Sequence, residues 1–139
     1  LSVYKKGRPL GIYDIGLARN GLAAKLHSGD YATPEGKYRI IKKLPSSRYY
    51  KALLINYPNQ EDEKKFNLAK KKGLIPSGVG IGSLIEIHGG GNDSLTDGCI
   101  CLENEDIDKI FNLVEVGTPV TIVGAIGNPN KISLMIKGL

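Results

Sequence analysis

The sequence predicts a mainly β domain with two peripheral helices, and three observations lead to this prediction. Short runs of β-branched, aromatic and leucine residues, bounded by Gly, Pro, Asn or Ser, dominate the first half of the 139-residue chain. Two later segments instead carry the charge order and periodicity of helices. Apolar residues make up 41% of the chain and charged residues 24%, which is typical of a folded domain. We therefore expect one core over residues 1–139.

The elements can be assigned in order along the chain. Four strands are expected first: SVYK, LGIYDI, KYRII and ALLINY. QEDEKKFNLAKKKG has acids first, lysines last and Gly73 as a stop, which predicts a surface helix over residues 60–72. Residues 84–87 are expected to form a strand, 89–97 a loop and 99–102 a short extended piece.

A second helix and two further strands complete the prediction. Asn104 is expected to cap an amphipathic helix of about ten residues that ends near Gly117. Its apolar residues recur at i, i+3, i+4 and i+7: Ile107, Ile110, Phe111 and Val114. The strands are PVTIV at 119–123 and KISLMI at 131–136, with a turn of Gly, Asn and Pro between them.

The net charge of +5 favours an acidic partner. Six basic residues follow Glu35 with no carboxylate before Glu61: Lys37, Arg39, Lys42, Lys43, Arg48 and Lys51. A solvated basic face and a surface for a carboxylate-bearing peptide or anionic polymer both explain this stretch. No nucleic-acid-binding motif occurs, so we expect no nucleic acid. No apolar run reaches the ~18 residues of a membrane-spanning helix, and LSVYKKGRPL lacks the features of a signal peptide.

One segment holds a histidine and a cysteine of a chain that has only two of each: IHGGGNDSLTDGC, residues 87–99. A free thiol has a pKa of about 8.5 and is mostly protonated at neutral pH, so a nucleophilic Cys99 needs a base. His88 is the nearby imidazole, and a hairpin-like return of the loop would bring it to the thiol. Gly89 and Gly98 would let the backbone approach a substrate and an oxyanion. Taken alone, the pattern fits a nucleophile with its base or a buried thiol beside a flexible turn.

Metal binding is the rival chemistry. His88, Asp97, Cys99 and Cys101 could supply ligands, but structural zinc uses four Cys or His at recurring spacings, and a second pair does not occur. We therefore expect no metal and no cofactor. Cys99 and Cys101 are too close in sequence for an unstrained disulfide. His27, in the polar segment KLHSGD, is expected to be solvated.

Three blocks of sequence stand in the order of a known family and span about residues 1–123. They are SGDYATPEGKYRI, SSRYYKALLINYPNQED and HGGGNDSLTDGCICLEN. The last resembles the catalytic motif of the L,D-transpeptidase (YkuD-like) family, in which His-Gly precedes Ser/Thr-x-Gly-Cys by a variable loop. The first is similar to that family's Gly-x-x-x-Thr-Pro-x-Gly-x-Tyr/Phe segment. The second is similar to the Ser-x-Tyr-x-x-Ala-Leu and Tyr-Pro-Asn-x-x-Asp blocks of its YafK-related branch.

The resemblance implies a β-sandwich of mixed sheets that acts on peptidoglycan stem peptides outside the cytoplasm, in the periplasm or cell wall. Cys99 would attack the carbonyl that precedes D-Ala, expel D-Ala and form a thioester. His88 would serve as general base and acid. The resemblance further implies oxyanion or supporting roles for Gly98, Thr96 and Gly89, and substrate contacts for Tyr57, Arg48 and Asp97.

The chain also departs from the family pattern, and the outcome of the reaction stays open. Many members have His or Lys before the Gly-Cys pair and Arg two residues after the Cys, where this chain has Asp97 and Cys101. Thr-Asp-Gly-Cys is similar to the YafK-related branch. An amine acceptor would give a crosslink or attach a protein to the wall, whereas water would give L,D-carboxypeptidase or endopeptidase cleavage. A peptidoglycan-binding module without turnover is the alternative of another class.

Overall fold

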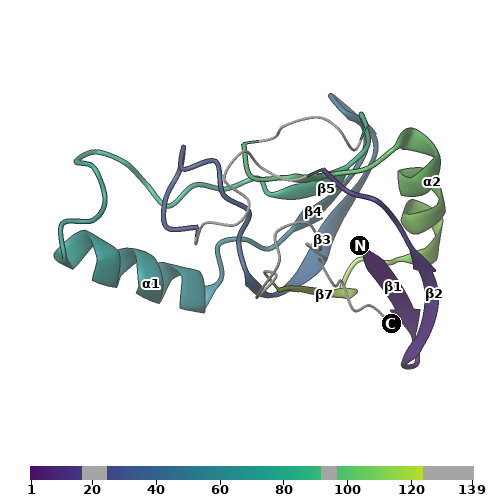
Figure 1. The fold of residues 1–139 in the computed structure, drawn as a ribbon, viewed down its shortest axis with the longest axis horizontal. Coiled ribbons are helices and arrows are strands. Elements are labelled where there is room, and N and C mark those ends of the chain that lie inside the picture. The colour runs from purple at the N-terminus through teal and green to yellow at the C-terminus, as the bar shows by residue number, and fades with distance from the viewer. Residues whose placement is uncertain (17–24, 92–96, 124–139) are drawn as a thin grey trace.

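A computed structural model describes residues 1–16, 25–91 and 97–123 of the chain (Figure 1). Its centre is a curled five-stranded mixed sheet of order β6-β5-β4-β3-β7. The strands are β3 (Gly36–Ser47), β4 (Tyr50–Ile55), β5 (Glu86–His88), β6 (Ile100–Cys101) and β7 (Pro119–Ile122). β1 (Ser2–Lys5) and β2 (Arg8–Ile12) form a separate antiparallel pair. The predicted mainly β fold with mixed sheets and two short helices is confirmed, whereas the strand expected at 131–136 lies outside the described residues.

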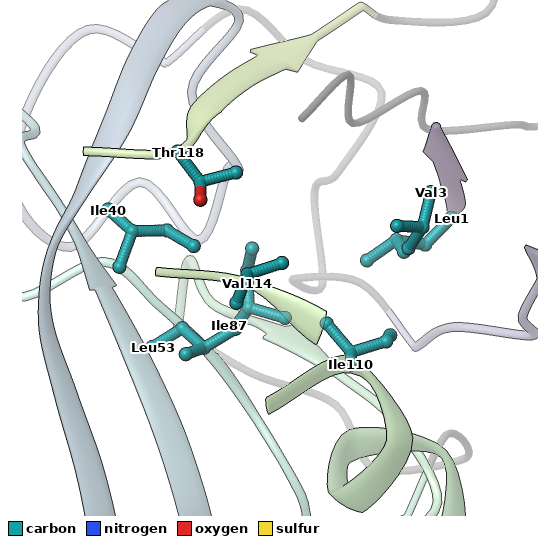
Figure 2. A pocket seen from close by; sticks show the side chains of 8 residues that line it. All are labelled: Leu1, Val3, Ile40, Leu53, Ile87, Ile110, Val114 and Thr118. Atoms are coloured by element: carbon teal, nitrogen blue, oxygen red, sulfur yellow. The ribbon is translucent and has the colours of Figure 1, made fainter. Parts of the chain in front are cut away.

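The two faces of the central sheet differ in chemistry. Strand residues alternate between faces, and Leu53, Ile87 and Ile100 belong to the main hydrophobic core. The N-terminal Leu1 and Val3 complete this core from the other side, as Figure 2 shows around a small apolar pocket. The opposite face therefore carries the remaining residues of β4, β5 and β6, among them Ala52, Glu86, His88 and Cys101.

Helix α1 (Gln60–Lys71) confirms the helix expected over residues 60–72. Asn59 caps it, because its side chain accepts the N–H of Asp62 while the Asp62 carboxylate accepts the N–H of Asn59. The Tyr38 hydroxyl donates to both oxygens of the buried Asp62 carboxylate at 2.9 and 2.8 Å. This contact ties the start of α1 to β3.

Helix α2 (Asn104–Leu113) corrects two details of the prediction. Glu103 occupies the cap position, without a side-chain cap hydrogen bond, and Asn104 is the first helical residue. The Asn104 side-chain oxygen instead accepts the N–H of Gly90 at 2.9 Å, so it fastens the histidine loop to the helix. The helix ends before Gly117 because Val114 already has extended backbone angles. Within the described ranges, neither helix is long and apolar enough to cross a membrane.

The pairing of β5 with β6 corrects the expected hairpin-like return. The two strands are parallel, with Ile87 opposite Ile100 and His88 opposite Cys101. β5 also begins two residues later than expected, because Leu84 has a positive φ of 59° that interrupts an extended chain. The chain therefore crosses over between the two strands, and both run in the same direction at the edge of the sheet.

Candidate active site

Cys99 directly precedes β6 and lies beside β5. Its Sγ accepts the N–H of Glu86 at 3.4 Å and donates to the carbonyl oxygen of Leu84 at 3.6 Å. Burial raises the pKa of the Cys99 thiol to about 11; the Glu86 N–H opposes this rise, and the Glu86 and Asp97 charges add to it. At neutral pH the thiol is therefore protonated, and nucleophilic attack requires a base.

His88 ends β5 and is only 4% exposed. Its Nδ1 lies 2.5 Å from the carbonyl oxygen of Gly89. Because a carbonyl oxygen only accepts, this contact assigns the ring proton to Nδ1 and leaves Nε2 as the basic nitrogen. The Tyr49 ring stacks on the imidazole with centroids 4.4 Å apart and planes 21° apart, and the Arg48 guanidinium lies 5.4 Å from the Tyr49 ring centroid. The imidazole is thus held in both orientation and tautomer.

The parallel register relates the histidine to the cysteine. Ile87 and Ile100 are opposite one another, so their chain neighbours point to the other face of the sheet. Glu86 and His88 therefore lie on the same face of β5, and Cys101 lies opposite His88. The Cys99 thiol lies at the edge of β5, against the backbone of Leu84 and Glu86, two residues before His88.

Two glycines in the site are required by their surroundings. At Gly98, φ is +151°, and a Cβ would lie 2.9 Å from Cδ1 of Ile85. At Gly89, a Cβ would lie 2.7 Å from the side-chain oxygen of Asn104. The Gly89 N–H donates to the carbonyl oxygen of Lys51 at 2.9 Å, so Gly89 supports the site through the position of its carbonyl beside His88.

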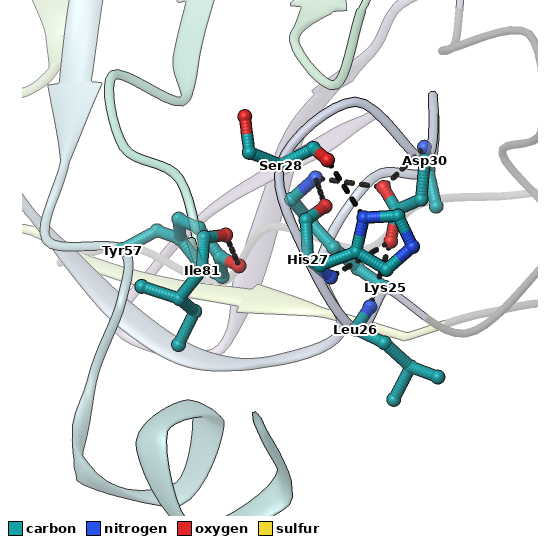
Figure 3. A network of polar contacts seen from close by, with 8 residues as sticks. Lys25, Leu26, His27, Ser28, Asp30, Tyr57 and Ile81 are labelled. Carbon is teal, nitrogen blue, oxygen red and sulfur yellow. Dashed lines mark hydrogen bonds and ion pairs between the residues drawn. The ribbon is translucent and has the colours of Figure 1, made fainter. Parts of the chain in front are cut away.

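The remaining expected site residues have different surroundings. Tyr57 is buried, and its hydroxyl donates to the carbonyl oxygen of Ile81 at 2.9 Å, which favours a supporting position (Figure 3). Arg48 is exposed at the turn between β3 and β4. Asp97 is exposed and lines a cavity of about 250 Å³ with Lys25, Tyr31 and other residues. Thr96 lies outside the described residues.

Residues of the loop around Asp30 line this cavity. Figure 3 shows the polar contacts within the loop. The Lys25 ammonium pairs with the Asp30 carboxylate at 2.9 Å, and the backbone N–H groups of Leu26, His27 and Ala32 also donate to it. Burial acts to raise the pKa of Asp30, but these hydrogen bonds outweigh it and hold the pKa below its ordinary value. His27 is half-buried, and its Nδ1 lies 2.6 Å from the carbonyl oxygen of Ser28. The Lys25 and Asp30 pair therefore stabilises the loop.

The described part of the chain contains no group of three or more His, Cys, Asp or Glu residues arranged to hold a metal ion. Cys101 is fully buried in β6, where its backbone pairs with Gly16.

Comparison with known proteins identifies the family. The L,D-transpeptidase catalytic domain family, YkuD, matches residues 1–122. The chain belongs to this family. It is also 35% identical over 107 residues to YafK of Escherichia coli K12, a protein provisionally named an L,D-transpeptidase, with the same values for the O157:H7 strain. These matches cover 76% of this chain but 37% of the relatives, so the chain spans little more than a third of their length.

Two solved structures have similar folds. Bd1075 of Bdellovibrio bacteriovorus has a TM-score of 0.56 at 24% identity, over 84% of this chain and 39% of that one. Pgp2 of Campylobacter jejuni, a helical cell shape determining protein, has a TM-score of 0.55 at 27% identity, over 81% of this chain and 37% of that one. The resemblance inferred from the three sequence blocks is confirmed at the level of the family.

Sequence reasoning did not select three residues that shape this candidate site: Tyr49, Glu86 and Asn104. Tyr49 occupies the tyrosine position of the Ser-x-Tyr-x-x-Ala-Leu block, which was an available signal. Glu86 lies two residues before His88, so strand alternation alone places both side chains on one face. For Asn104 the helix-start pattern pointed to a cap, and the contact with Gly90 becomes visible only in the folded chain.

Proposed function

We propose that this chain is a cysteine-dependent L,D-transpeptidase domain that acts on peptidoglycan stem peptides through a thioester at Cys99. The observation that carries the proposal is the parallel pairing of β5 with β6, which brings Cys99 alongside β5, where its Sγ contacts the N–H of Glu86, two residues before His88. Family membership supports the reaction type. Because peptidoglycan lies outside the cytoplasm, the proposed site of action is extracytoplasmic.

The first half of the reaction forms the thioester. Nε2 of His88 takes the thiol proton as Sγ of Cys99 attacks the carbonyl carbon that precedes D-Ala. Since the resting thiol is neutral, proton transfer accompanies attack instead of preceding it. The oxyanion of the tetrahedral intermediate is stabilised by backbone N–H groups around Gly98 and Cys99. Collapse breaks the bond to D-Ala, whose amine leaves with the proton held by His88.

The second half transfers the acyl group. An acceptor amine or water gives a proton to His88 and attacks the thioester carbonyl, and the Cys99 thiolate leaves and recovers the proton. An amine acceptor gives a crosslink or attaches a protein to the wall, and water gives carboxypeptidase or endopeptidase cleavage. In this proposal Thr96 supports the site, Arg48 and Asp97 border the substrate, and Tyr57 acts through the loop that it holds.

The test is mass spectrometry of muropeptides incubated with the wild-type chain, Cys99→Ala and His88→Ala. We expect loss of D-Ala or release of a wall-linked peptide with wild type, and a fall of at least about 10³-fold in rate for either variant. Cys101→Ala, which removes the other thiol, is the matched control and should retain activity. Unchanged muropeptides with folded wild-type protein, across several stem peptides, would refute the proposal.

A further inference from the structure

Glu86 lies beside the thiol, and its charge acts on Cys99, but its carboxylate has no role in the reaction described above. It begins β5, its backbone N–H holds Sγ of Cys99 at 3.4 Å, and its side chain shares a sheet face with His88. Its position in the sheet is fixed by pairing with Leu54 of β4. A carboxylate is therefore built into the wall of the site, next to the reacting sulfur.

One oxygen of this carboxylate lacks a donor. Oε2 of Glu86 is buried, and within the described part of the chain it has no hydrogen-bond partner. Three other partly or fully buried carboxylates have donors or a cation: Asp62 accepts from Tyr38 and Asn59, Asp30 accepts from three backbone N–H groups and Lys25, and Asp108 pairs with Lys51. Burial of an ionised oxygen without a donor is unfavourable. Glu86 thus lacks the partners that this chain gives its structural carboxylates.

A hydrogen-bond donor would satisfy Oε2 of Glu86. A positively charged donor would also compensate the negative charge of the carboxylate. No ion pair within the described ranges includes Glu86. A single carboxylate suits a primary ammonium group, since a metal site would need further ligands. We propose that Glu86 binds an ammonium group of the substrate beside Cys99, an inference that rests on the proposed function.

Such binding would couple the charge of the substrate to the reactivity of the thiol. The Glu86 carboxylate adds to the rise in the pKa of Cys99 that burial causes. An ammonium bound at Glu86 offsets this negative charge and makes the thiol easier to deprotonate. A substrate with the ammonium would then gain both in binding and in the rate of attack.

Two sources of the ammonium are compatible with this position. The donor peptide can carry a side-chain ammonium on the residue whose carbonyl is attacked. The acceptor can instead arrive as an ammonium that gives one proton to the Glu86 carboxylate and then attacks the thioester as a neutral amine. Both groups approach Cys99, but in different halves of the reaction. Separate measurement of the two halves distinguishes them.

The first arm uses a tetrapeptide that ends in D-Ala after a residue with a free side-chain amine, and the same peptide with that amine acetylated. If the donor supplies the ammonium, the wild-type chain releases D-Ala from the free-amine peptide with at least about tenfold higher kcat/KM. Glu86→Gln removes the charge at constant shape and abolishes this preference. Glu63→Gln, an exposed substitution in α1 with the same charge change, retains it.

The second arm measures how the thioester partitions between an added amine acceptor and water. If the acceptor supplies the ammonium, Glu86→Gln lowers the ratio of aminolysis to hydrolysis by at least about tenfold, and Glu63→Gln leaves it unchanged. A Glu86→Gln protein with wild-type preference in the first arm and wild-type partitioning in the second would overturn the inference.

A binding measurement separates failure of this inference from failure of the proposed function. Calorimetry on Cys99→Ala, with and without Glu86→Gln, compares affinities for the free-amine and acetylated tetrapeptides and for the amine acceptor. Loss of the preference for an ammonium-bearing ligand on Glu86→Gln supports the inference even if wild type proves inactive. An unchanged preference contradicts it even if wild type is active. Thermal unfolding of each variant checks that it is folded.

Discussion

The thiol of Cys99 combines a nucleophilic position with an environment that favours its neutral form. Burial beside the Glu86 carboxylate raises its pKa, while hydrogen bonds to the edge of β5 fix the sulfur. A thiol of this kind depends on proton transfer to an oriented base, which is the role proposed for His88. Cys99 is therefore expected to react as a neutral thiol that His88 deprotonates during attack, and not as a thiolate already paired with a protonated His88.

This thiol also predicts a pH dependence of stability. The folded pKa of about 11 exceeds the ordinary value of 9.0, so the folded chain holds this proton more tightly than the unfolded chain does. The stabilisation is complete below about pH 9 and is lost as the pH rises toward 11. Between about pH 9 and pH 11, the free energy of unfolding measured with urea should fall less steeply with pH for Cys99→Ala than for wild type. Parallel curves for the two proteins would contradict the assigned environment.

Some residues of the candidate site could be predicted from the sequence, whereas others become evident only from contacts in the folded chain. His88 and Cys99 were recognisable because their motif is local and its spacing is typical of one family. The Tyr49 stack on His88 and the unpartnered Glu86 oxygen depend on which strands become neighbours. The buried hydroxyl of Tyr57 likewise depends on packing against Ile81, which no local pattern encodes.

At the scale of elements, the turn between β3 and β4 covers the histidine. Tyr49 stacks on the imidazole, and the next strand accepts the Gly89 N–H at Lys51. The helix prediction for α1 succeeded because its capping and charge order are local, whereas the direction of β6 did not follow from alternation. Strand direction is decided by the crossover and by the core face that both strands must share.

The Tyr49 contact predicts a graded effect on rate. Tyr49→Ala removes the ring that orients His88 and should lower the rate of D-Ala release by about tenfold or more, whereas Tyr49→Phe retains the stacking surface and most of the rate. Tyr50→Ala, at the neighbouring exposed position, is the matched control. Equal rates for Tyr49→Ala and Tyr50→Ala would show that the stack does not position the base.

The histidine loop also predicts an effect on stability. A Cβ at Gly89 would meet Asn104 at 2.7 Å and Ile107 at 3.1 Å, so Gly89→Ala must displace the loop from α2. We expect a loss of about 1–3 kcal/mol in the free energy of unfolding, measured with urea. Gly80→Ala is the control, since its Cβ meets no atom within 4 Å. A neutral Gly89→Ala would mean that this packing is looser than described.

At the scale of the whole molecule, one face of the central sheet forms the hydrophobic core and the other carries residues of the candidate site. One face packs against α2 and the N-terminal strand to form the core, and the other carries Glu86 and His88, with the Cys99 thiol at the edge of β5. The mainly β class followed from strand periodicity and turn residues, and the family followed from three ordered blocks. The basic stretch around β3 remains compatible with the carboxylates of a stem peptide, a role that belongs to the proposed substrate.

Intact-protein mass spectrometry can detect the proposed thioester at Cys99 as a covalent adduct. The chain is mixed with a D-Ala-terminated tetrapeptide without an acceptor amine and quenched in acid during the first turnover. We expect an added mass equal to the peptide acyl group without D-Ala on the wild-type chain, slower appearance of this adduct on His88→Ala and no adduct on Cys99→Ala. No adduct on the folded wild-type chain, or an equal adduct on Cys99→Ala, would contradict the proposed thioester.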